Sequence, residues 1–90
     1  MWRAEYKKRF LKELARLPPH IREKAEEIVF KEMPGVDPFR VGYVEKMTGY
    51  ANKHKIRVGS YRIGLTIDTG ASLVTFERVA DRKDIYRVFP

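Results

Sequence analysis

Basic side chains stand at alternate positions in one short stretch of the chain: Lys53, Lys55 and Arg57. A β-strand would place these cations on one face, because successive side chains point to opposite sides. The other face would then hold the intervening residues, His54, Ile56 and Val58. Gly59-Ser60 has the composition of a two-residue hairpin turn, which would set Arg62 directly opposite Arg57.

No acidic residue occurs between Lys46 and Ile67. Like charges that face each other across a sheet destabilise it by about 0.2–1 kcal/mol per pair. Charge on the outer face of a strand is usually its solvated side, but cations gathered without acids are equally well explained by an anionic ligand. Gly64, expected beside Lys55, would leave room for a substrate backbone.

Few reactions fit these residue types. The chain has no cysteine and two histidines, His20 and His54, which excludes a thiolate zinc site and a cysteine nucleophile. No carboxylates are grouped for acid hydrolysis, and the four aspartates are not clustered for a divalent metal. Metal-free RNA cleavage remains, in which a 2′-OH attacks the adjacent phosphate. Arginines would stabilise the developing charge, and a lysine among cations can act as general base. We therefore expect no cofactor.

The first half of the chain predicts one strand and two helices. Residues 1–6 alternate with period two, which indicates a short strand. Apolar residues at helical spacing before Pro18, and again from Pro19 to Met33, indicate two helices joined by a proline corner. The segment Pro34–Tyr50 has no clear period and is interpreted as a loop.

The second half predicts three antiparallel strands, at 53–58, 61–67 and 72–79, with Val74 and Phe76 facing Leu65 and Ile63. A tail from Asp81 to Pro90 follows and could return over the basic face. Together, the predicted elements of the two halves indicate an α+β fold, in which a short N-terminal strand precedes a two-helix hairpin. The hairpin would pack on one face of a three- to four-stranded antiparallel sheet.

Length and charge narrow the function classes. Ninety residues can close one core, so a single domain spanning 1–90 is expected. The net charge is +7, and residues 46–90 carry nine basic against four acidic side chains. This surplus favours a nucleic acid partner. No apolar run is long enough for a membrane span or a signal peptide, so we expect a cytoplasmic protein without a membrane partner.

Two segments, His54–Gly64 and Val79–Tyr86, together resemble the signature of the RelE/ParE superfamily of toxins from prokaryotic type II toxin–antitoxin systems. Along the chain, the shared features are a basic-apolar alternation, a Gly turn, a Tyr-Arg pair and a terminal Arg…Tyr. The predicted helix hairpin is also a feature of this superfamily. The resemblance implies the RelE-like microbial RNase fold. It also implies a ribosome-dependent endoribonuclease that cleaves mRNA in the ribosomal A site, with ribosome, mRNA and a cognate antitoxin as partners.

The resemblance also implies roles for individual residues. Lys55 and Arg57 match two basic strand positions, the second of which is a lysine in the family and a proposed general base. Because arginine is a poor base, either Lys55 takes that role or activity relies more on positioning and charge. Arg62 matches the arginine that stabilises the phosphate, Arg82 one that assists the leaving group, and Tyr86 a tyrosine that stacks on the substrate. The candidate RNA-binding cations are Lys46, Lys53, Lys83 and Arg87. Asp81 stands where relatives often carry a basic residue, and a C-terminal helix would be missing or short.

Two rival functions stay open. One is a ParE-like protein that inhibits DNA gyrase without cutting nucleic acid, and it is less favoured because such proteins generally lack the Arg62, Arg82 and Tyr86 set. The other is a non-catalytic nucleic-acid-binding module, which is weakened by the lack of an aromatic pair on the open strands.

Overall fold

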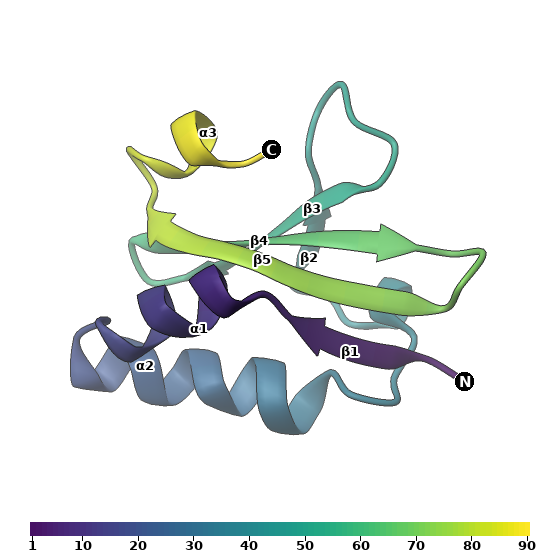
Figure 1. Ribbon diagram of the computed structural model, residues 1–90, viewed down its shortest axis with the longest axis horizontal. Helices are drawn as coiled ribbons and strands as arrows, with labels where there is room; N and C mark the ends of the chain where they lie inside the picture. The colour runs from purple at the N-terminus through teal and green to yellow at the C-terminus, as the bar shows by residue number, and fades with distance from the viewer.

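Five strands form one mixed sheet in the computed structural model, which describes residues 1–90 (Figure 1). The strand order is β1-β5-β4-β3-β2, and the neighbours β3, β4 and β5 are antiparallel. The bounds are β1 Arg3–Tyr6, β2 Val44–Lys46, β3 Lys53–Val58, β4 Tyr61–Asp68 and β5 Leu73–Asp81. The predicted α+β class is confirmed, but the sheet is larger than predicted and β1 pairs with β5 in parallel.

Two helices cover one face of this sheet, as predicted. They are α1, Lys8–Ala15, and α2, Pro19–Glu26, which continues into a π-helical segment, Glu27–Glu32. Phe10 and Leu14 lie one turn apart on α1 and are fully or nearly buried against the sheet. Proline at the first position of α2 starts that helix, because its fixed backbone angle suits the first turn.

The segment 34–50 is more ordered than predicted. It contains a 3₁₀ turn, Pro38–Arg40, where the Asp37 side chain accepts a hydrogen bond from the backbone N of Phe39 at 2.9 Å. It also contains β2, which pairs antiparallel with β3 at the edge of the sheet. A strand of three residues is too short to show a period in the sequence, so its existence depends on its neighbour.

The register between β4 and β5 differs from the prediction. Leu65 faces Phe76 and Ile67 faces Val74, so the pairing is shifted by two residues. The register changes again between Gly64 and Leu65, where β5 has one extra residue. A bulge of this kind inserts a residue into one strand, which alternation alone does not reveal. The predicted β3–β4 register is confirmed, and Arg57 faces Arg62.

The tail crosses to the other face of the sheet. It forms one short helix, α3, Ile85–Val88, and a small second core in which Met47, Ile85 and Phe89 are buried. In Figure 1, α1 and α2 lie on one side of the sheet, while α3 and the loop between β2 and β3 rise from the other. None of the helices is long and apolar enough to cross a membrane.

His54 is the one buried polar residue of the sheet, 5% exposed, and it lies on the helix-covered face as predicted. Its ring meets Phe39 edge-on, with centroids 5.8 Å apart, and Nδ1 has no hydrogen-bond partner. Burial lowers the pKa of His54, because an apolar environment disfavours the charged imidazolium.

Candidate functional site

Lys55 and Tyr86 meet over the open face of the sheet. The Lys55 Nζ donates a hydrogen bond to the Tyr86 hydroxyl at 2.6 Å and lies 5.2 Å from the centroid of its ring. Lys55 is held by β3 and Tyr86 by α3, so the tail returns over the basic strand. A lysine nitrogen carries more than one N–H donor, so Lys55 keeps hydrogen-bonding capacity for a further oxygen.

A small cavity of about 210 Å³ opens beside this pair. Its walls come from the tail, from β3 and from the loop between β2 and β3, and they are Met47, Thr48, Tyr50, Lys55, Tyr86, Phe89 and Pro90. Tyr50 and Tyr86 are both about half exposed, at 47% and 58%. The cavity therefore combines two exposed tyrosine rings and the buried ring of Phe89 with one cation, a combination that suits a nucleobase next to a phosphate.

Sequence reasoning missed Tyr50. Tyr50 ends the segment Pro34–Tyr50, which has no strand pattern that would link this residue to the basic face. One feature of the sequence could have indicated Tyr50. It is an aromatic residue three positions before the basic strand, on the connection that leads into that strand.

Three arginines gather near the turn between β3 and β4. Arg62 donates from one guanidinium nitrogen to the carbonyls of Gly59 and Tyr61, each at 2.9 Å. The backbone N of Arg82 donates to the carbonyl of Ser60 at 2.8 Å, which brings the tail to the same turn. Arg57 lies opposite Arg62. The backbone of Arg82 and the side chain of Arg62 thus lie at the same turn, and neither arginine forms an ion pair with a carboxylate.

The open face carries acids, contrary to the expectation from the stretch between Lys46 and Ile67. Glu45, from β2, accepts a hydrogen bond from Arg57 Nε at 3.2 Å. Glu77, from β5, lies 3.8 Å from Lys53 Nζ. Both carboxylates come from neighbouring strands, so the repulsion expected among the cations is partly relieved. Lys55 is the strand cation that neither carboxylate engages.

The space above Gly64 is filled, which corrects the expected opening for a substrate backbone. A Cβ at this position would lie 2.5 Å from a ring carbon of Phe89. Lys53 Nζ also lies 5.6 Å from the centroid of the Phe89 ring and donates to Thr66 Oγ1 at 3.0 Å. Gly64 therefore admits the tail, and Lys53 is packed beneath it.

The other predicted RNA-binding cations, Lys46, Lys83 and Arg87, do not line the cavity beside Lys55. Lys46 lies opposite His54 in the pairing of β2 and β3. Because directly opposed residues share a face of the sheet, the Lys46 side chain is on the helix-covered face, as His54 is. Arg87 pairs with Asp84 and lines a cleft beside α1. Lys83 is exposed, and its backbone N donates to Asp81 Oδ1 at 2.9 Å.

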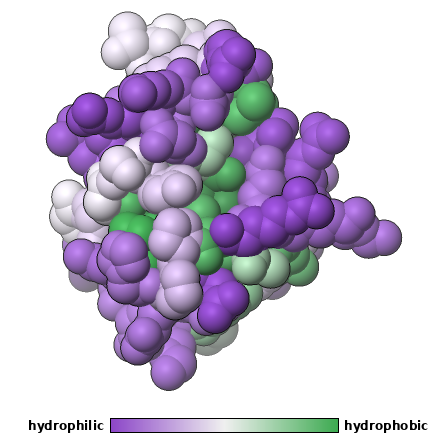
Figure 2. All heavy atoms as spheres, turned by 90° about the vertical axis from the view of Figure 1, so that its left-hand side faces the viewer, coloured by the Kyte–Doolittle hydropathy of each residue, from purple (hydrophilic) through white to green (hydrophobic).

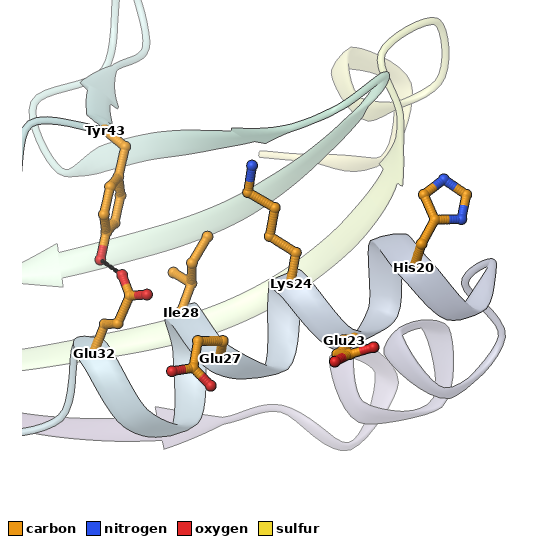
Figure 3. A pocket seen from close by; sticks show the side chains of 7 residues that line it. All are labelled: His20, Glu23, Lys24, Glu27, Ile28, Glu32 and Tyr43. Carbon is orange, nitrogen blue, oxygen red and sulfur yellow. Dashed lines mark hydrogen bonds between the residues drawn. The ribbon is translucent and has the colours of Figure 1, made fainter.

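A separate cavity of about 490 Å³ lies on the helix side of the sheet and contains none of the candidate residues. Figure 3 shows its lining, in which Tyr43 reaches from the segment before β2 toward Glu32. The Tyr43 hydroxyl donates to Glu32 Oε1 at 2.8 Å. Burial, with a smaller effect of Glu32, raises the pKa of Tyr43 to about 12. No cluster of three or more His, Asp or Glu side chains that could hold a metal occurs in the chain.

Comparison with known proteins agrees with this architecture. The chain is 36% identical over 87 residues to Toxin RelE3 from Methanocaldococcus jannaschii, and the match covers 94% of this chain and 96% of the relative. The chain belongs to the RelE toxin family. No family model matches it, so the assignment depends on this relative and on solved RelE structures.

Two solved structures show the fold shared within the RelE family. The RelB–RelE antitoxin–toxin complex from Methanococcus jannaschii superposes with a TM-score of 0.78 at 34% identity, covering 96% of this chain and 99% of that one. The RelBE2 toxin–antitoxin complex from Mycobacterium tuberculosis has a TM-score of 0.70 at 25% identity, covering 92% and 93%. The predicted relationship to toxins of toxin–antitoxin systems is thereby confirmed.

Proposed function

We propose that this RelE-family protein is a ribosome-dependent endoribonuclease that cleaves mRNA in the ribosomal A site without a catalytic metal. The observation that carries the proposal is the pair of Lys55 and Tyr86, 2.6 Å apart, on a face that also holds Arg57 and Arg62. These groups supply a base, a hydroxyl and fixed positive charge, which is what 2′-OH attack on a phosphodiester requires.

Lys55 is assigned as the general base. Arg57 is engaged by Glu45 and keeps its proton at any physiological pH, so it contributes charge rather than proton transfer. In the reaction, the 2′ oxygen gives its proton to Lys55 Nζ and bonds to phosphorus. The bond from phosphorus to the 5′ oxygen breaks, and that oxygen takes up a proton from water. The products are a 2′,3′-cyclic phosphate and a 5′-OH.

Arginines on this face would stabilise the charge on the phosphoryl oxygens. Arg62 is placed beside the turn by two backbone carbonyls, which restrict its guanidinium without neutralising it. Arg82 lies at the same turn and would act on the leaving oxygen. Tyr86, with Tyr50, would hold the base of the cleaved nucleotide in the cavity of about 210 Å³.

A cognate antitoxin of the RelB type is the proposed protein partner. The two related toxins with identities of 25% and 34% were solved in complexes with RelB antitoxins, and each superposes on more than nine-tenths of this chain. We expect binding of the antitoxin to block access of mRNA to Lys55 and Tyr86.

Primer extension on a translated message tests the proposed activity. Purified protein is added to programmed ribosomes, and cleavage is mapped in the A-site codon. Arg62→Ala and Tyr86→Phe should each reduce the cleavage rate, whereas Lys31→Ala, an exposed cation on the helix side, should not. A message with a 2′-deoxy nucleotide at the cleavage position should stay intact.

Two outcomes would contradict the proposal. Wild-type cleavage by both site variants would remove Arg62 and Tyr86 from the mechanism, and cleavage of the 2′-deoxy message would exclude attack by the 2′-OH. Toxicity with intact message and inhibited gyrase would instead support the ParE-like alternative.

A further inference from the structure

The outer edge of β1 has no strand beside it. β1 is the last strand at one side of the sheet, and its one neighbour is β5 (Figure 1). The backbone N of Arg3 and that of Lys7 both donate to carbonyls on the β5 side. Because backbone groups alternate between the two sides of a strand, Ala4 and Tyr6 direct their N–H and C=O groups outward. An unpaired edge of this kind is ready to pair with another strand.

The exposed charges of β1 are complementary to themselves. Ala4 lies beside the buried Val74 on the helix-covered face, so Arg3 and Glu5 are both on the open face. Both are exposed, and neither has an ion-pair partner within the chain. In an antiparallel pairing of two copies about a two-fold axis at Ala4, Arg3 of each copy lies opposite Glu5 of the other. Opposite charges at directly opposed positions stabilise a strand pair.

The other edge of the sheet lacks this property. β2 has three residues, and a two-fold pairing at its centre would set Glu45 opposite Glu45 of the second copy. Glu45 is also engaged by Arg57. Charges that only protect an edge repel a second copy, as a row of lysines does. The order of Arg3 and Glu5 attracts one instead.

Aromatic side chains flank the β1 edge on the helix-covered side. Trp2 meets Phe39 edge-on with ring centroids 6.2 Å apart, and the rings of Tyr6 and Phe30 are 5.0 Å apart. Phe30 and Phe39 remain 41% and 55% exposed. At the opposite end of the molecule, which Figure 2 faces, hydrophilic side chains surround recessed apolar atoms. Exposed rings beside an unpaired strand are a surface that a partner would cover.

The same two-fold pairing brings these rings together. With Ala4 opposite Ala4 of the second copy, Trp2 lies opposite Tyr6 of the second copy, and the reverse holds by symmetry. Each aromatic pair of one copy therefore approaches the other aromatic pair of its partner. Aromatic side chains at opposed positions stabilise strand pairing further. Charge and aromatic packing thus favour one and the same register.

We propose that the protein forms a two-fold dimer through β1, in which the two sheets join into one continuous sheet. The proposal is independent of the cleavage proposed above, because β5 and β4 separate β1 from the strand that holds Lys55. The net charge of +7 opposes association. At about 0.15 M salt, however, exposed charges more than about 8 Å apart are largely screened, whereas directly opposed pairs are closer than that.

Sedimentation equilibrium of the purified full chain, free of antitoxin, tests the dimer at about 0.15 M salt. Arg3→Glu and Glu5→Arg each set like charges opposite one another and should weaken self-association by about tenfold or more. The double variant, Arg3→Glu with Glu5→Arg, reverses both charges and should associate as the wild type does. An equimolar mixture of the two single variants should form heterodimers of similar affinity. Lys24→Glu and Glu23→Arg make the same charge changes at exposed positions of α2 and should leave association unchanged.

A backbone variant tests strand pairing separately from charge. Ala4→Pro removes an N–H that faces away from β5, so it should abolish the dimer while the circular dichroism spectrum stays that of the wild type. The charge variants decide the question if Ala4→Pro does not fold, since Arg3 and Glu5 are exposed.

Three results would overturn the proposal. The first is a wild-type protein that stays monomeric up to about 1 mM. The second is a double charge variant that associates no better than the single variants. The third is unchanged self-association of Glu5→Arg together with weaker binding of the antitoxin, which would assign the β1 edge to a strand of the antitoxin.

Discussion

The carboxylate of Glu13 and the guanidinium of Arg78 are joined by several hydrogen bonds, the shortest 2.7 Å, across 65 residues of chain. β1 pairs with β5 only as far as Phe76, so the next part of β5 has no strand beside it. Glu13 accepts a hydrogen bond from the backbone N of Val79 at 3.1 Å, so a side chain satisfies a backbone donor that no neighbouring strand reaches. Arg78 also donates to the Val88 carbonyl at 3.3 Å, which connects α1 to the tail.

Glu13→Gln should lower the free energy of unfolding by about 2 kcal/mol. The substitution keeps the shape but removes charge-assisted hydrogen bonds, and it leaves Arg78 half-buried without a counter-ion. Urea unfolding at pH 7 measures the change. Glu23→Gln, at an exposed position on α2, serves as control and should change stability by less than about 0.5 kcal/mol. Equal effects of the two variants would show that the bridge to Arg78 contributes nothing.

Lys55→Met should slow mRNA cleavage by about 10²- to 10⁴-fold, the usual contribution of a general base. Lys55→Arg should be nearly as slow, because arginine keeps the positive charge but does not accept a proton. Lys46→Met removes a cation from the other face of the sheet and should cleave normally. Single-turnover cleavage on programmed ribosomes measures all three. Near-normal cleavage by Lys55→Arg would reduce the role of Lys55 to electrostatic stabilisation.

Gly64→Ala should destabilise the protein by about 1–3 kcal/mol, because the new Cβ would approach the Phe89 ring to 2.5 Å. Gly42→Ala is the matched control, since nothing lies within 4 Å of a Cβ there. In a double-mutant cycle, Phe89→Ala should remove most of the cost of Gly64→Ala. An additive cycle would mean that the contact between Phe89 and Gly64 is not the source of the strain.

Stability should decrease on mild acidification because of His54. Burial lowers the pKa of His54 in the folded protein, while the unfolded chain keeps a value near 6.5. Below about pH 6.5 the unfolded state therefore binds more protons, and stability is lost as the pH falls toward the folded-state value. The urea midpoint should drop between pH 7.5 and 5.5 in the wild type.

The control for this prediction is His54→Gln, which has no group that titrates in this range. Its urea midpoint should be lower than that of the wild type at pH 7.5, because a polar side chain replaces a packed ring. It should then vary little down to pH 5.5. An equally steep dependence in the variant would assign the loss to other groups.

The part of the candidate site that lies on the β3–β4 hairpin could be predicted from local sequence patterns. The alternation in Lys53–Val58 and the turn at Gly59-Ser60 together determine the β3–β4 register, which places Arg57 opposite Arg62. Such a hairpin involves neighbours in the chain, so spacing and turn chemistry are sufficient. The basic face and its relation to the RelE/ParE signature could therefore be predicted from the sequence.

Contacts between distant segments decided the rest. Glu45 reaches Arg57 only because the short strand β2 pairs with β3, and that same pairing turns Lys46 to the opposite face. The bulge in β5 changes the register beside Gly64, and Phe89 from the tail fills the space above that glycine. None of these contacts follows from periodicity, since each depends on how the chain returns to the sheet.

The sequence by itself determined the fold class, the cationic strand face and the residue types available for chemistry, because alternation and turns are local properties. Only the tertiary structure decided that Tyr86 meets Lys55, that carboxylates from neighbouring strands accompany the cations, and that Arg87 belongs to a different cleft. The physical reason is that each of these contacts joins segments that are distant in the chain. Strand pairing brings the carboxylates to the cations, and the burial of Ile85 and Phe89 packs the tail across the sheet.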